Sequence, residues 1–161
     1  AALLQLVALL YFLPFLKLLK NKFSPLTTFL LGTALFSYFL KLFFQLFSCL
    51  PWFAVKSFEA KNYVIIGYLH LVVLGFISLF LLVWILRTKT FTLKGGWSKF
   101  GVFLLMAGIF LSETFLFSKG LLQWLNKATF NNFHELLFVV STLMPLGLIV
   151  FWFGQKKKAL R

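Results

Sequence analysis

Long apolar stretches separated by short polar segments run along the whole chain. A stretch of roughly 18 or more apolar residues predicts a helix that crosses a bilayer, because about 20 residues at 1.5 Å each span a ~30 Å hydrocarbon core. Five such stretches are present, and we predict membrane spans at about residues 1–19, 24–50, 62–86, 98–118 and 131–153. The predicted fold is an all-α integral membrane helical bundle of about five transmembrane helices, forming one domain over 1–161.

Serine and proline residues mark some of the predicted helix ends. Ser24 followed by Pro25 is typical of an N-cap and first helical position, and Pro51 ends the second stretch. Pro145 lies inside the fifth stretch, where a lipid-embedded helix tolerates it. Residues 1–16 supply only about 24 Å of helix, short of a full span. We therefore expect the chain to be part of a longer protein whose first helix begins upstream.

Composition excludes a water-soluble fold. Hydrophobic residues make up 61% of the chain and charged residues 12%, whereas soluble domains carry about 25% charged residues. The net charge of +13 could indicate nucleic-acid binding, but the cations flank apolar stretches, as they do beside membrane spans. The expected partner is the lipid bilayer and not nucleic acid. The single Cys49 excludes an intrachain disulfide and a thiolate cluster built by this chain alone.

The basic residues fall unequally on the two sides of the predicted membrane. One side holds Lys17, Lys20, Lys22, Arg87, Lys89, Lys94, Lys99, Lys156, Lys157, Lys158 and Arg161. The other side holds Lys56, Lys61, Lys119 and Lys127. Because cytoplasmic loops carry the excess of Lys and Arg, this asymmetry predicts a cytoplasmic C-terminus and an external N-terminus.

Ionisable side chains inside the spans are the candidate functional residues, since each costs a few kcal/mol in lipid unless sheltered. They are Lys41, His70, Glu113, His134 and Glu135. The predicted orientation and a rise of 1.5 Å per residue bring all five into the outer half of the membrane. We predict a polar cluster there, made of Lys41, Gln45, Tyr63, His70 and Glu113.

Helical periodicity gives these residues a common face. An α-helix rotates by 100° per residue, and on this basis small and polar residues fall on one stripe of the second span and on one stripe of the third. Such a stripe indicates the side of a helix that faces the bundle. The stripes are Ala34, Ser37, Lys41, Gln45 and Ser48, and Tyr63, Gly67, His70, Leu74 and Ser78. Gly108 and Ser112 form a small-xxx-small pair on the fourth span, suited to close helix contact.

Each candidate also has a structural interpretation. Lys41 could extend its ammonium to the outer headgroups, and Glu113 could pair with Lys41 or with a backbone group. A neutral His70 could join two helices by a hydrogen bond instead of ligating haem or handling protons. His134 and Glu135 fit the first turn of the fifth helix, which favours a carboxylate.

Several segments together carry a resemblance to a known family. They are SPLTTFLLGTALFSYFLKLFFQLFSCLP, IIGYLHLVVLGFISLFLL, SETFLFSKGLLQWL and NNFHELLFVVSTLMPLGL. Over about residues 24–153 they resemble the C-terminal half of an uncharacterised bacterial multi-pass membrane family. The preceding half of such proteins has His-bearing helices similar to those of haem–copper oxidase and nitric oxide reductase catalytic subunits. The resemblance implies a bacterial inner-membrane location, further transmembrane helices as partners, and His70 as a haem or metal ligand.

Depth limits what this chain could ligate by itself. His70 and His134 differ by roughly 8 Å along the membrane normal, whereas two axial ligands of one haem lie at nearly equal depth. We expect any partner ligands of His70 on helices outside this chain.

No soluble-enzyme motif names a catalytic residue. The expected function is redox chemistry or proton transfer at His70, with Lys41 and Glu113 tuning the charge. The alternatives are a permease for a small solute and a non-catalytic subunit of a membrane complex.

Overall fold

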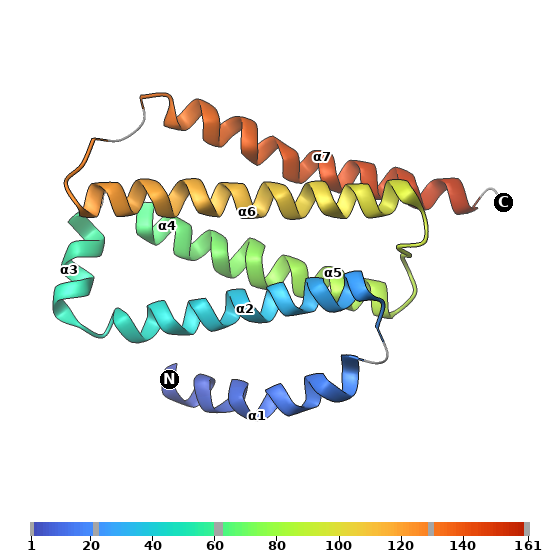
Figure 1. Cartoon of the computed structure of the whole chain (residues 1–161), viewed down its shortest axis with the longest axis horizontal. Coiled ribbons are helices and arrows are strands. Elements are labelled where there is room, and N and C mark those ends of the chain that lie inside the picture. Colours follow the sequence, from blue (N-terminus) through green and yellow to red (C-terminus); the bar gives the residue numbers. More distant parts are fainter. Residues whose placement is uncertain (1, 21–22, 60–62, 129–130, 160–161) are drawn as a thin grey trace. The chain divides into compact units, whose positions relative to one another are not determined.

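The computed structural model describes residues 2–20, 23–59, 63–128 and 131–159, and within these ranges it is all-α, with no strand (Figure 1). The elements in order are α1 (Ala2–Lys20), α2 (Pro25–Phe47), α3 (Pro51–Glu59), α4 (Tyr63–His70), the π-helical segment η1 (Leu71–Ser78), α5 (Leu79–Arg87), α6 (Gly96–Trp124) and α7 (Phe133–Ala159). Lys22, Lys61 and Arg161, three residues of the orientation count, lie outside the described ranges.

Four helices are long and apolar enough to cross a membrane. They are Pro25–Phe47, Tyr63–Arg87, Gly96–Trp124 and Phe133–Gln155, and α1 adds the shorter apolar stretch Leu3–Phe12. Large aromatic side chains on these helices are exposed, among them Phe103, Phe110 and Phe138, each at 66% or more. An apolar exterior of this kind requires lipid as the solvent. The chain is therefore a multi-pass helical membrane protein.

Helix ends follow the local sequence signals in part. Ser24 Oγ accepts a hydrogen bond from Thr27 N at 3.3 Å and Pro25 begins α2, which confirms the predicted N-cap. The second span is predicted to run to about Leu50, where Pro51 would end it, but α2 already ends at Phe47. Pro51 instead begins the nine-residue α3, a helix that the apolar pattern does not predict. The fourth predicted span corresponds to α6, which continues past the predicted end at Ser118 to Trp124.

The chain divides into two compact units, residues 1–84 and 85–161, and each is described by itself. In the first unit α2 packs against η1. A Cβ atom on Gly75 would lie only 2.8 Å from Ser37 Oγ, so the glycine permits the close approach of the two helices. The Tyr38 and Phe76 rings meet beside this contact, with centroids 4.7 Å apart.

In the second unit α6 packs along α7, and glycines on both helices remove the side chains between the two backbones. A Cβ on Gly147 would lie 2.5 Å from Leu105 N, and the predicted contact residue Gly108 lies against Leu143 and Met144. Gly101 and Gly154 make similar backbone contacts toward the start of α6 and the end of α7. The small-xxx-small pattern therefore predicted a real contact, but glycines of α7 complete it.

Gln155 joins the α5–α6 connection to α7. Its Oε1 accepts from Thr92 N and its Nε2 donates to Thr92 O, both at 2.9 Å. The same Nε2 lies 3.0 Å from Ser98 Oγ near the start of α6. One amide side chain thus satisfies both backbone groups of Thr92, which fixes the loop against the end of the helix pair.

Candidate functional site

Lys41, in the second half of α2, is held by neutral side chains. Its Nζ donates hydrogen bonds to Gln5 Oε1 at 2.9 Å and to Gln45 Oε1 at 2.7 Å. It also lies 5.7 Å from the centroid of the Tyr38 ring, within the range of a cation–π interaction. The ammonium is therefore bound by groups of α1 and α2, which differs from a side chain that extends alone to the headgroups.

Gln5 is a site residue that periodicity missed. It lies on α1, and its contact with Lys41, 36 residues later in the sequence, joins α1 to α2. The available signal was that Gln5 is the only amide among residues 1–16. An amide in an otherwise apolar span favours an interhelical hydrogen bond, because lipid offers it no partner.

His70 ends α4 at the junction with η1. The side chain is half-buried, and its Nδ1 atom is buried without a hydrogen-bond partner among the described residues. The eight residues that follow form the π-helix, in which Ser78 Oγ donates to Val73 O, five residues earlier, at 2.9 Å. Such wide turns are rare and recur at functional sites.

The packing of α2 on η1 brings Lys41 and His70 to a similar level. Ser37 meets Gly75, while residues near the end of α2 meet the start of α4, so the two helices run antiparallel. Four residues beyond Ser37, Lys41 lies close to the level of Leu71, the neighbour of His70. No hydrogen bond joins Lys41 to His70 in the described structure.

The buried face of the third span differs from the predicted stripe. The buried residues are Gly67, Leu71, Gly75, Leu79, Leu82 and Val83, while His70, Leu74 and Ser78 are half-buried. The predicted stripe assumes 100° of rotation per residue throughout, and the π-helical turns rotate less per residue. His70 therefore lies beside the packed face and not at its centre.

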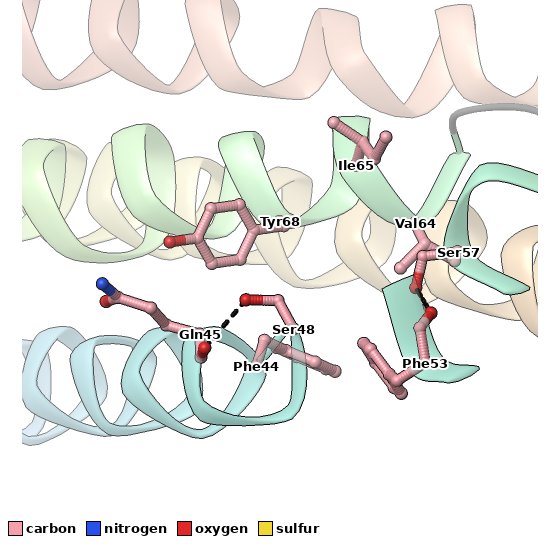
Figure 2. A pocket seen from close by; sticks show the side chains of 8 residues that line it. All are labelled: Phe44, Gln45, Ser48, Phe53, Ser57, Val64, Ile65 and Tyr68. Carbon is pink, nitrogen blue, oxygen red and sulfur yellow. Dashed lines mark hydrogen bonds between the residues drawn. The ribbon is translucent and has the colours of Figure 1, made fainter. Parts of the chain in front are cut away.

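A pocket of about 190 Å³ lies between the end of α2, α3 and the start of α4. Figure 2 shows the residues that line it, namely Phe44, Gln45, Ser48, Phe53, Ser57, Val64, Ile65 and Tyr68. Lys41 and its contacts Gln5, Tyr38 and Gln45 form a group that we call the Lys41 cluster. Gln45 belongs both to this cluster and to the pocket, because its side-chain oxygen accepts a hydrogen bond from Lys41. In Figure 2 the Tyr68 hydroxyl points to the same end of the pocket as the Gln45 amide.

Two further members of the predicted cluster are Tyr63 and Glu113. Tyr63 begins α4 and is half-buried. Glu113 belongs to the second unit, where it is buried and neither carboxylate oxygen has a hydrogen-bond partner in the described residues. The structure thus brings together Lys41 and Gln45, with His70 near their level, and the inclusion of Glu113 stays a prediction.

The start of α7 carries an aromatic contact at its first residues. His134 and Glu135 are exposed there, and the His134 ring meets Phe133 edge-on. Phe133 is fully buried, and Lys119 Nζ lies 3.9 Å from the centroid of its ring. The orientation count treats Lys119 as a loop residue, but it is buried inside α6.

The described residues contain no group of three or more His, Cys, Asp or Glu side chains placed to hold a metal ion. His70 could supply one ligand through an imidazole nitrogen, and the other ligands of a haem or metal would have to come from outside these residues. No protein-family model, curated protein or solved structure matches the chain.

Proposed function

We propose that the chain forms part of a bacterial inner-membrane protein that handles electrons or protons at His70, in the manner of the haem–copper oxidase-like proteins that its sequence resembles. The observation that carries this proposal is the buried Nδ1 of His70, which has no hydrogen-bond partner among the described residues and lies at the α-to-π junction of a helix of membrane-spanning length. An imidazole that only joined two helices would place this nitrogen in a hydrogen bond, because lipid offers no alternative partner.

The neighbouring charge suits this chemistry. The Lys41 ammonium lies near the level of His70 and contributes a positive charge in a medium of low dielectric. A nearby cation stabilises any negative charge that develops during electron uptake. A bound haem would supply the electron transfer itself; His70 would be one residue that holds it, and further protein ligands would come from helices outside this chain.

The test compares two histidine variants of the purified full-length protein. Glutamine keeps a donor and an acceptor but neither ligates haem well nor titrates near neutral pH. We expect His70→Gln to abolish a Soret absorption band, or proton-coupled activity if no band is present, at unchanged expression and helicity. His134→Gln, at an exposed position, is the matched control and should change neither. A His70→Gln variant that keeps full activity would contradict the proposed role of His70 in electron or proton transfer.

A permease for a small solute is the second candidate, and the pocket beside the Lys41 cluster favours it. Binding sites for small molecules are mostly apolar and contain a few convergent polar groups, which describes this pocket. Flux of labelled solute into proteoliposomes tests it. Absence of both flux and a His70-dependent activity would leave the chain as a non-catalytic subunit.

A further inference from the structure

Lys41 carries a positive charge that nothing in the described structure neutralises. Its two hydrogen-bond acceptors are the neutral amides of Gln5 and Gln45, and its third neighbour is the neutral Tyr38 ring. No described carboxylate pairs with it. These contacts satisfy two of the three ammonium protons but leave a full charge on a helix of membrane-spanning length. A charge in that position is stabilised most by an anion.

The pocket next to Lys41 has a largely apolar wall. Its two serine hydroxyls are already committed, because Ser48 Oγ donates to Gln45 O and Ser57 Oγ donates to Phe53 O, each at 2.8 Å. The Tyr68 hydroxyl makes no hydrogen bond within the described residues and points to the end of the pocket where the Gln45 amide lies (Figure 2). One free donor therefore lines an apolar pocket, and the Lys41 ammonium, which is not itself a lining group, lies 2.7 Å from the Gln45 oxygen at the same end.

The volume indicates how large an apolar group the pocket itself can hold. The pocket measures about 190 Å³, and an apolar cavity of about 150 Å³ is known to hold one benzene molecule. The space fits one aromatic ring, or a short aliphatic chain, with a small substituent.

We propose that this site binds a small organic carboxylate, with the carboxylate group on Lys41 and Tyr68 and the apolar body in the pocket. The proposal deepens the permease candidate by naming its solute class, and it does not depend on His70. Binding and flux are measured separately, so the two can fail separately. Carboxylate binding without flux would contradict the permease function but support the binding site. Flux without saturable carboxylate binding would contradict the binding site alone.

The experiment measures equilibrium binding of benzoate and of its neutral analogue benzamide to the detergent-purified protein by ligand-observed NMR. We expect Lys41→Met to weaken benzoate binding at least tenfold and to leave benzamide binding within twofold. Lys127→Met removes the same charge from an exposed position and serves as the matched control, which should bind both ligands as the unmodified protein does.

A second variant covers the case in which Lys41→Met does not fold, as judged by helicity and elution volume. Val64→Phe fills the pocket from α4 and should abolish binding of both ligands. Three results would overturn the proposal: no saturable benzoate binding by the unmodified protein, equal benzoate affinity in a folded Lys41→Met variant, or undiminished binding by Val64→Phe. Equal weakening by Lys127→Met would also overturn it, because attraction to net charge alone would then explain the binding.

Discussion

Cationic side chains on these helices are sheltered in different ways. Lys41 is bound by the amides of Gln5 and Gln45, and Lys119 packs its ammonium over the ring of Phe133. The amide dipoles and the Tyr38 ring surround the Lys41 charge, and the ring quadrupole of Phe133 faces the Lys119 charge. Such contacts fix the side chain, and at Lys41 they leave the net charge available for another interaction.

The Lys119–Phe133 contact should appear as a coupling energy. Lys119 is 6% exposed and Phe133 fully buried, so the cation–π interaction is desolvated and worth about 2 kcal/mol. We expect Lys119→Met and Phe133→Leu to be non-additive by about 1–2 kcal/mol in the free energy of unfolding. Chemical denaturation of the four proteins of the cycle in detergent measures this.

The control cycle pairs Phe133→Leu with Lys99→Met, an exposed lysine earlier on the same helix. That pair should be additive. If the coupling energy of Lys119 and Phe133 is no larger than that of the control pair, the ring of Phe133 stabilises the protein only through its buried apolar area.

At the level of single residues, the sequence identified charges but not their partners. Lys41 and Gln45 share a face at a spacing of four residues, so periodicity predicted their proximity. Gln5 was missed because its contact depends on how α1 packs against α2, which no local pattern encodes. The burial of Lys119 was missed for the same reason, since Phe133 lies on the next helix.

Among the helices, η1 shows where counting positions breaks down. The buried residues Gly67, Leu71, Gly75 and Leu79 recur every four positions. On a regular α-helix such a series drifts by about 40° per step, and the wider π-helical turn reduces this drift. The apolar pattern predicted a helix over this segment correctly, but the rotation of each side chain depends on packing against α2. By contrast, Ser24 and Pro25 define the start of α2 through purely local chemistry, so that end could be predicted.

The contact between α6 and α7 should depend on the absence of side chains at its glycines. A methyl group at position 147 would meet the backbone at Leu105 N, and backbone atoms cannot move aside as a flexible side chain can. We expect Gly147→Ala to lower the free energy of unfolding by about 1–3 kcal/mol, the usual cost of overpacking. Thermal unfolding in detergent, followed by circular dichroism, provides the measurement.

Gly32→Ala is the matched control, because a Cβ at this position on α2 has nothing within 4 Å. Here the alanine should be neutral or stabilising by up to about 1 kcal/mol, since it restricts the unfolded chain and favours the helix. Equal effects of the two substitutions would mean that helix propensity, not contact between the backbones, decides the outcome at Gly147.

At the scale of the whole molecule, hydropathy was sufficient for the fold class. Four of the five predicted spans correspond to helices long enough to cross a bilayer, and the first corresponds to α1 with its shorter apolar stretch. Hydropathy says which segments enter lipid because each residue contributes independently to that transfer. Which helices pack together depends instead on pairs of surfaces, as in the glycine contacts of α6 and α7.

The orientation of the chain is the prediction that concerns the whole molecule. The excess of Lys and Arg beside the third loop and the tail predicts that both lie in the cytoplasm, since positively charged loops are retained on that side. In a Cys49→Ser background, single cysteines introduced at Lys94 and at Lys158 should resist an impermeant maleimide in intact cells and react after the membrane is permeabilised. A cysteine at Lys127 is the opposite control and should react in intact cells. Labelling at position 94 or 158 from outside would contradict the cytoplasmic tail, and the predicted location of Lys41 and His70 in the outer half of the membrane would then be inverted.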